Sequence, residues 1–281
     1  MYSYRSLKDV SPVEVIRLVN DVFKDYIVPI DWNLKSFEKD VKEYSISLND
    51  SFICYDDGTP IGFSIVSHRG ELGRIDSIGV LPKYRGEGIA SEIIYRTIET
   101  LKWKGIKKII LEVEQNEKRA INFYKKHGFK EKRKLISLNL KTDSKEKYDY
   151  KYVEEDNIWL KENAFKAKTN LDRKPNWQRH PQTLEKSEDR YRIEKVVEWG
   201  YTIGYVVWGE NVDNAYIVDA SPIDDKTPFK EFISDVVKRV TEKYDSVSVV
   251  AVPEDDLLYK ALLDNGFKEF LIQVEMEEKI H

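Results

Sequence analysis

IDSIGVLPKYRGEGIA, residues 75–90, is the stretch of this sequence that decides the fold. Its apolar first part predicts a strand, Gly86 and Gly88 predict a tight turn, and the apolar spacing from Ile89 onward predicts a helix. Glycine at these positions permits left-handed backbone angles and close approach of a ligand to the main chain. The first amides of a helix lack intrahelical partners and lie at its positive dipole end. The turn is therefore typical of a pyrophosphate-binding site.

The glycine turn differs from the two best known phosphate-binding motifs. No Gly-Lys-Ser/Thr follows it, which excludes a Walker motif, and the third glycine of the dinucleotide fingerprint is missing. Arg85 can add a charge-assisted contact to an anion. Because a pair of glycines also occurs in ordinary strand-to-helix turns, the surrounding order of elements has to decide between the two interpretations.

Regular patterns surround this turn in a fixed order. Apolar residues at helical spacing predict helices, and alternating or continuous short apolar runs predict strands. Helices are expected at 9–26, 88–103 and 117–127, and strands at 52–55, 61–67, 74–80, 107–114 and 134–140.

The second half of the chain repeats this order. KKHGFKE at 125–131 is similar to LDNGFKE at 263–269, and PIGFSIV at 60–66 is similar to TIGYVVW at 202–208. Chance recurrence in a Lys/Glu-rich chain explains one such match but not the matching order of elements, so we interpret the chain as an internal duplication. Regular patterning resumes at 159–168. Helices are expected near 228–243 and 255–264, and strands at 191–197, 202–208, 214–219 and 246–252.

These segments resemble the GNAT superfamily of N-acetyltransferases. Residues 75–90 resemble its acetyl-CoA signature, Gln/Arg-x-x-Gly-x-Gly/Ala, with Lys83 in the first position, and NEKRAINFYKKHGFKE at 116–131 is similar to its second conserved block. The resemblance covers residues 2–140. It implies an α/β (α+β) fold of two GNAT-like domains, each a mixed, mostly antiparallel sheet flanked by helices. The expected organisation is a catalytic domain at 1–145, a linker at 146–158 and a degenerate domain at 159–281.

The resemblance also implies acetyl-CoA as co-substrate and assigns residues to it. Ile78 and Val80 would offer backbone groups to the pantetheine arm. Asn116 would either bond the pantetheine or cap the following helix, and Tyr124 would protonate the leaving thiolate, unless it is a core aromatic. The amides expected to hold the pyrophosphate belong to Arg85, Gly86, Glu87, Gly88, Ile89 and Ala90.

An amine must lose a proton before it can attack a thioester, and a carboxylate suits this task. Asp76 is the first candidate, because strand alternation would place it on the same side as Ile78 and Val80. Glu71 is the second candidate. The alternative is that Asp76 is only a solvated or ion-paired residue.

In the superfamily, the acceptor side is built from the first helices and their connection. In this chain, that stretch contains Phe23, Tyr26, Pro29, Trp32 and Phe37. These residues could pack against an aliphatic or cationic amine. They could equally be core residues, which is the expectation for Phe23 and Phe37.

The second half lacks all three cofactor-binding features. Its counterpart of the glycine turn, DASPIDDKTP, contains no glycine, and its aspartates would repel a pyrophosphate. Tyr124 corresponds to Leu262 and Asn116 to Glu254. The second domain is therefore expected to have a GNAT-type fold without cofactor binding.

Composition limits the remaining function classes. The chain has 281 residues with 46 basic and 50 acidic ones, a net charge of −4 that argues against nucleic acid as a partner. A single cysteine and four scattered histidines argue against disulfides and a metal site, so no metal is expected. No stretch approaches the roughly 18 apolar residues of a membrane span, and no signal peptide is recognised, so a cytoplasmic protein is expected.

The predicted function is transfer of acetyl from acetyl-CoA to a primary amine, either on a small molecule or on a protein N-terminus or lysine. The alternative is a non-catalytic acyl-CoA-binding or adaptor protein. Tyr124 and a nearby carboxylate favour the enzyme. Both a monomer and a homodimer are compatible with the sequence.

Overall fold

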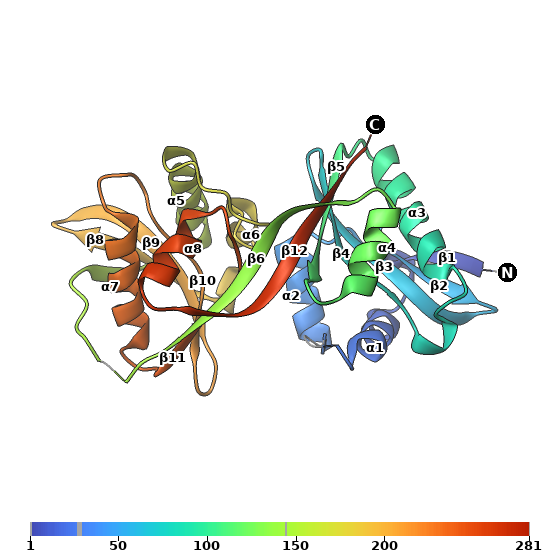
Figure 1. Ribbon diagram of the computed structural model, residues 1–281, viewed down its shortest axis with the longest axis horizontal. Coiled ribbons are helices and arrows are strands. Elements are labelled where there is room, and N and C mark those ends of the chain that lie inside the picture. Colours follow the sequence, from blue (N-terminus) through green and yellow to red (C-terminus); the bar gives the residue numbers. More distant parts are fainter. Residues whose placement is uncertain (1, 27–29, 144, 281) are drawn as a thin grey trace. The chain divides into compact units, whose positions relative to one another are not determined.

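The computed structural model describes residues 2–26, 30–143 and 145–280. The chain divides into two compact units, unit 1 comprising Met1–Lys132 and Glu275–His281, and unit 2 comprising Arg133–Val274 (Figure 1). These bounds differ from the expected ones at 145 and 159. The reason is that β6 (Lys130–Lys141) and β12 (Lys268–Lys279) each contribute residues to both units.

The linker expected at 146–158 is also different in the structure. Residues Lys151–Glu154 form strand β7, which pairs antiparallel with β8 (Arg192–Glu198). The side chains of this segment are mostly charged, so its apolar pattern is too weak to indicate a strand. The strand conformation therefore depends on backbone pairing with β8 and not on a pattern of apolar side chains.

Unit 1 is a mixed sheet with helices on both faces. The sheet order is β1-β2-β3-β4-β5-β12, and β4 and β5 form the parallel pair among the antiparallel ones described. Its elements are β1 (Tyr2–Ser6), α1 (Pro12–Phe23), α2 (Leu34–Tyr44), β2 (Phe52–Asp56), β3 (Thr59–Arg69), β4 (Leu72–Val80), α3 (Ile89–Trp103), β5 (Lys108–Glu114) and α4 (Lys118–Lys126).

Alternation along the strands divides the core of unit 1 between the two faces. Ile53 of β2 packs with Val19 of α1 and Phe37 of α2. Its neighbour Cys54 packs with Ile93 of α3 on the other face. Cys54 is fully buried, as expected of a small apolar core residue.

Unit 2 repeats the elements of unit 1 in the same order, which confirms the predicted duplication. Its sheet order is β6-β11-β10-β9-β8-β7, and β10 and β11 are again a parallel pair. The elements after β7 are α5 (Asn157–Asn170), α6 (Pro181–Glu185), β8, β9 (Tyr201–Glu210), β10 (Ala215–Pro222), α7 (Phe229–Thr241), β11 (Ser246–Pro253), α8 (Leu257–Asp264) and β12. In the parts of the chain that are described, no helix is long and apolar enough to cross a bilayer.

Candidate functional site

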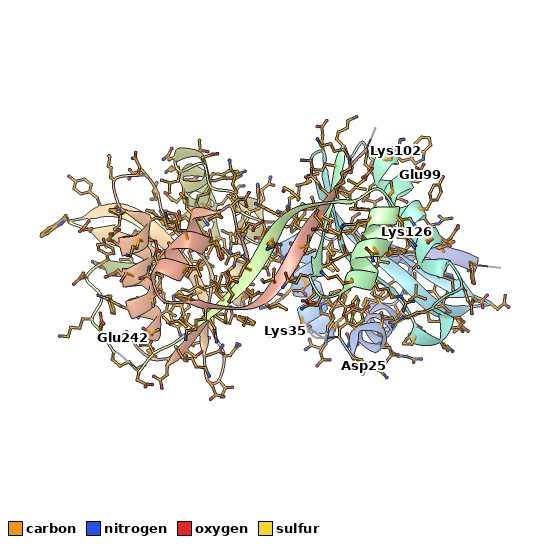
Figure 2. All side chains as sticks on the ribbon, viewed as in Figure 1. Asp25, Lys35, Glu99, Lys102, Lys126 and Glu242 are labelled. Atoms are coloured by element: carbon orange, nitrogen blue, oxygen red, sulfur yellow. The ribbon has the colours of Figure 1, made fainter. Side chains whose placement is uncertain are left out.

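A cleft of about 500 Å³ lies in unit 1 where β4 leads into α3. The described register of β4 with β5 ends at Arg74 and Ile110, and the cleft is lined by the part of β4 beyond it, Ile78–Val80. The turn before α3, the first turn of α4 and two residues after α1 form its other walls. One of these two residues, Asp25, is labelled in Figure 2. A strand edge beyond its paired part, beside a helix N-terminus, gives an extended ligand access to backbone groups.

The glycine turn has the geometry expected from the sequence. Gly86 has φ +94° and Gly88 has φ +83°, both in the left-handed region, and Gly88 is the N-cap of α3. A Cβ placed at either residue would meet no other atom within 4 Å, so the backbone faces open space. Arg85 donates from Nε to the Val80 carbonyl at 2.9 Å, which fixes its guanidinium beside the end of β4. The turn therefore presents unshielded amides together with one cation.

Most residues that the resemblance assigned to the cofactor lie at this cleft. Glu87 does not line it, in keeping with an assignment that concerned only its amide. Asn116 and Tyr124 are also not among the lining residues, although Phe123 is. Those that do line it are Ile78, Val80, Arg85, Gly86, Gly88, Ile89 and Ala90.

The expected helix cap at Asn116 is wrong. Helix α4 begins at Lys118 with Glu117 as its N-cap, so Asn116 lies one residue too early. Its side-chain amide and its backbone N–H both donate to the Glu114 carboxylate, each at 2.9 Å. Asn116 is exposed, and its donors pair with the nearby carboxylate.

Tyr124 lies next to the cleft, behind Phe123. Its ring packs edge-on against Phe123, with centroids 5.4 Å apart, and against Phe129 at 5.9 Å. Burial raises the pKa of Tyr124 to about 12, and the electrostatic effect of Tyr26 acts in the same direction. Tyr26 itself lines the cleft. The Tyr124 phenol is therefore protonated at neutral pH and able to donate.

Asp76 lies at a β-bulge of β4. Ile65 pairs with Ser77 and Val66 with Ile75, so Asp76 is the extra residue between them. The expectation that Asp76 shares a face with Ile78 assumed regular alternation, which the bulge interrupts. Ser67 donates to Asp76 Oδ2 at 2.5 Å.

The ionisation of Asp76 is set by opposing effects. Burial raises its pKa to about 6, although the Arg74 cation and the hydrogen bond from Ser67 act in the opposite direction. Arg74 donates from Nη1 to Asp76 Oδ1 at 3.0 Å. Asp76 is therefore ion-paired and also close to the range in which a carboxylate exchanges protons at neutral pH.

Glu112 is a buried carboxylate that the sequence analysis did not consider. Its side chain is 7% exposed, and its Oε2 lies 3.5 Å from Arg74 Nη2. Glu112 follows Ile110 by two residues on β5, just as Asp76 follows Arg74 on β4, so both carboxylates lie just beyond the last described pair. The signal that could have found it is a lone charge inside the apolar run IILEV.

Glu71, the second predicted base, lies away from the cleft. It belongs to the turn before β4, at the end of that strand opposite to Val80, and its side chain is exposed. Its backbone carbonyl accepts hydrogen bonds from Lys107 and Lys108. The structure therefore does not bring Glu71 together with the other candidate residues.

The aromatic residues of the expected acceptor side have different environments. Tyr26 lines the cleft, whereas Phe37 is buried in the core, as expected, and Phe23 packs against that core. Trp32 donates from Nε1 to Asp40 at 2.8 Å. Pro29 lies outside the described residues.

Unit 2 has a different connection at the place that corresponds to the glycine turn. β10 ends at Pro222 and α7 begins at Phe229, so the connection is two residues shorter than that between β4 and α3. It contains no glycine, and Pro228 is the N-cap of α7. None of its residues, 223–228, has the positive φ seen at Gly86 and Gly88.

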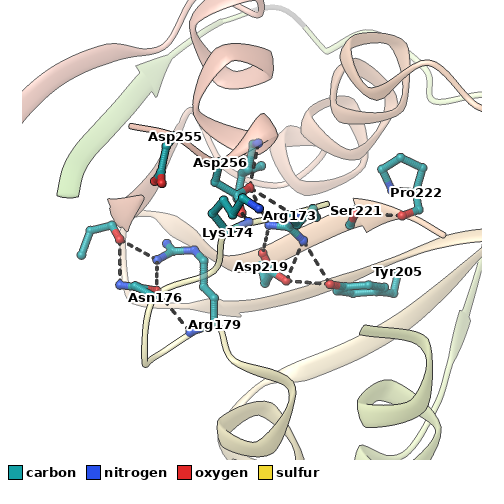
Figure 3. A network of polar contacts seen from close by, with 12 residues as sticks. Arg173, Lys174, Asn176, Arg179, Tyr205, Asp219, Ser221, Pro222, Asp255 and Asp256 are labelled. Carbon is teal, nitrogen blue, oxygen red and sulfur yellow. Dashed lines mark hydrogen bonds and ion pairs between the residues drawn. The ribbon is translucent and has the colours of Figure 1, made fainter. Parts of the chain in front are cut away.

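A buried polar network joins β10 to α8 in unit 2. Arg173, from the connection between α5 and α6, lies 2.9 Å from Asp219 of β10 and 3.0 Å from Asp256, the N-cap of α8 (Figure 3). Tyr205 donates to Asp219 at 2.7 Å. These four side chains are buried.

The same connection also binds the backbone of β11. Asn176 and Arg179 each donate to the Ala251 carbonyl at 2.9 Å. The described pairs of β10 with β11 end at Tyr216 and Ser248, before these contacts. Side chains of unit 2 thus satisfy backbone groups at the position where unit 1 has its cleft.

Comparison with known proteins assigns a family to part of unit 1. Residues 17–129 match the model of the acetyltransferase (GNAT) family, a range that includes the glycine turn and α4. Unit 1 is therefore a GNAT-family acetyltransferase domain.

Among similar proteins, N-alpha-acetyltransferase 30 of Schizosaccharomyces pombe is 33% identical over 84 residues, 28% of this chain and 56% of that protein. An uncharacterised N-acetyltransferase of Methanocaldococcus jannaschii is 38% identical over 89 residues, 29% of this chain and 39% of that protein. The chain thus matches about half of the length of these relatives or less.

Two solved structures share the fold over both units. A GCN5-related N-acetyltransferase from Sphaerobacter thermophilus has a TM-score of 0.72 at 12% identity, covering 99% of this chain and 95% of that one. A tandem GNAT protein from the clavulanic acid biosynthesis pathway has a TM-score of 0.69 at 13% identity, covering 99% and 98%. At this level of identity, the likeness concerns the fold alone.

Proposed function

We propose that this chain transfers an acetyl group from acetyl-CoA to a primary amine, with the reaction in unit 1. The observation that carries the proposal is the cleft beyond the paired part of β4 and β5, with the glycine turn at its edge. Backbone groups of Ile78 and the N–H of Val80 are available to the amides of a pantetheine arm, and the amides from Gly86 to Ala90 to its pyrophosphate. The Arg85 N–H, which the sequence analysis also assigned to the pyrophosphate, donates to the Pro82 carbonyl at 3.2 Å instead. Acetyl-CoA supplies the activated acyl group, and this chain supplies binding, orientation and proton transfer.

Two kinds of group in unit 1 suit the proton transfers of this reaction, although neither lines the cleft. Asp76 or Glu112, directly or through water, accepts the proton that the attacking amine must lose. Tyr124 donates a proton to the thiolate as it leaves, and its pKa of about 12 keeps the phenol protonated until then. The carboxylates and the phenol thus divide the base and acid roles.

The acceptor class is proposed from the similar proteins. One of them is named N-alpha-acetyltransferase 30, which suggests a protein N-terminal amine as the first acceptor to try. The test incubates the full chain with acetyl-CoA and measures thiol release. The panel contains peptides with a free N-terminus, an N-terminally blocked peptide with one lysine, polyamines and amino acids. Acetyl-CoA binding without thiol release from any of these amines would favour the non-catalytic alternative.

Tyr124→Phe is expected to lower kcat by about 10²-fold, because it keeps the ring and removes the proton donor. Affinity for acetyl-CoA should change little, since Tyr124 does not line the cleft. Tyr95→Phe is the matched control, because it removes the phenol of an exposed tyrosine on α3. Wild-type turnover of Tyr124→Phe between pH 6 and 9 would contradict the general-acid role.

A further inference from the structure

Arg74 is a buried cation that joins two strands at the point where their described pairing ends. Its exposed fraction is 8%, and its partner in the last pair is Ile110 of β5. Its Nη1 donates to Asp76 of its own strand at 3.0 Å, and its Nη2 lies 3.5 Å from Glu112 of β5. One guanidinium therefore holds both candidate bases.

Other charged and titratable groups face this cluster from each neighbouring element. Ser67 of β3 donates to Asp76, and Arg69 of the same strand acts on it electrostatically. The guanidinium of Arg74 lies 5.8 Å from the ring of Tyr44 on α2. From β12, the buried Glu275 adds a negative charge but is itself paired with Lys132 at 2.5 Å. Among the described contacts, Arg74 is thus a cation that touches both Asp76 and Glu112.

Removing water from two neighbouring carboxylates favours their neutral form, and each carboxylate disfavours ionisation of the other. A fixed cation between them opposes both effects. A protonated carboxylic acid cannot accept the proton of an ammonium group. The site therefore needs a cation that favours the ionised carboxylate if it is to work near neutral pH.

We propose that Arg74 is a positioning residue for the acetyl transfer, which holds Asp76 and Glu112 beyond the last described pair of β4 and β5 and keeps Asp76 ionised as a proton acceptor. The inference rests on the proposed function. The ammonium proton passes to one carboxylate, the amine nitrogen forms the new bond to the acetyl carbon, and the bond from that carbon to sulfur breaks. The thiolate takes a proton from Tyr124, the attacking nitrogen loses its second proton to water, and Tyr124 and the carboxylate then exchange protons with solvent. Arg74 gains and loses no proton in this sequence.

The test compares Arg74→Gln with Arg74→Lys in the full chain. Arg74→Gln removes the cation, and this should raise the apparent pKa of the acidic limb of kcat/KM by about one to three pH units. Activity at pH 6 should therefore fall by at least about tenfold, while activity at pH 9 changes less. Arg74→Lys restores a cation, so the apparent pKa of the acidic limb of kcat/KM should return most of the way to the wild-type value. Lysine cannot reproduce the contact of one guanidinium with both carboxylates.

A second readout does not depend on activity. Carbon-13 NMR of the side-chain carboxyl groups follows the ionisation of Asp76 without any substrate, and its signal is assigned with Asp76→Asn. In Arg74→Gln the Asp76 pKa should rise, and in Arg74→Lys it should return toward the wild-type value. Arg96→Gln is the matched control, because Arg96 lies on α3 over the Tyr4 ring at 4.0 Å, outside the cluster.

The outcomes separate the inference from the function on which it rests. An unchanged acidic limb and an unchanged Asp76 titration in folded Arg74→Gln would overturn the role of Arg74 and leave acetyl transfer intact. A wild-type chain that acetylates no amine would overturn the proposed function and with it the catalytic role of Arg74. If Arg74→Gln does not fold, Arg74→Lys decides the question. The proposal is then refuted if the pH profile of kcat/KM in Arg74→Lys differs from that of the wild type while the Asp76 carboxyl titrates as in the wild type.

Discussion

Replacing both Gly86 and Gly88 by alanine is expected to weaken CoA binding by about 10²-fold or more. Both residues have positive φ, which costs alanine about 1–2 kcal/mol per residue, so the amides of the turn move away from their present directions. Each lost charge-assisted hydrogen bond is worth about 1.5–3 kcal/mol, and about 1.4 kcal/mol corresponds to a factor of ten in affinity. Isothermal calorimetry with CoA measures the loss. Because unit 2 lacks the glycine turn, we expect one CoA per wild-type chain.

The matched control is the double alanine variant of Gly58 and Gly70. These glycines also have positive φ and also have no atom within 4 Å of an added Cβ, but they lie in the turns that follow β2 and β3. The two double variants therefore carry similar strain, and only one of them alters the cleft. Equal loss of CoA binding in both, or unchanged affinity in the Gly86/Gly88 variant, would contradict the assignment of the turn.

The sequence was sufficient to predict the segment from β4 to α4 and its repetition. The glycine turn, the apolar face of α3 and the strand β5 are local patterns, and the structure places them as predicted. α2 was not predicted, because its sequence LKSFEKDVKEY buries only Phe37 among its apolar residues. The helix is stabilised by a capping box at Asn33 and Ser36 and by packing on the core.

The features that the sequence could not predict depend on partners distant along the chain. β12 has an alternating pattern typical of a strand, but no local signal indicates that its last residues belong to unit 1. The bulge at Asp76 depends on the register with β3, and a single strand does not encode its register. The sequence does not show that Glu112 lies 3.5 Å from Arg74, and the role proposed for Glu112 follows from that distance.

Arg173→Met is expected to lower the free energy of unfolding by about 3–5 kcal/mol, because it leaves the Asp219 and Asp256 carboxylates buried without their cation. Methionine retains much of the side-chain volume, so the loss reports mainly on charge. Arg192→Met is the matched control, because its ion pair with Glu210 at 3.0 Å is exposed. Breaking that pair should cost at most about 1 kcal/mol. Equilibrium denaturation in urea at pH 7.5 measures both variants.

The pH dependence of Arg173→Met distinguishes a lost charge from lost packing. In the wild type, burial opposes ionisation of Asp256, but the ion pair with Arg173 and the backbone N–H groups of Leu258 and Lys174 hold its pKa below the usual range. This stabilisation is present above the pKa of the unfolded carboxyl and is lost as pH falls through the folded value. Without Arg173 the buried carboxyls bind protons more tightly in the folded state than in the unfolded state, because burial then dominates. The destabilisation by Arg173→Met should therefore shrink as pH falls from 8 to 5, whereas a packing defect would cost the same at both values.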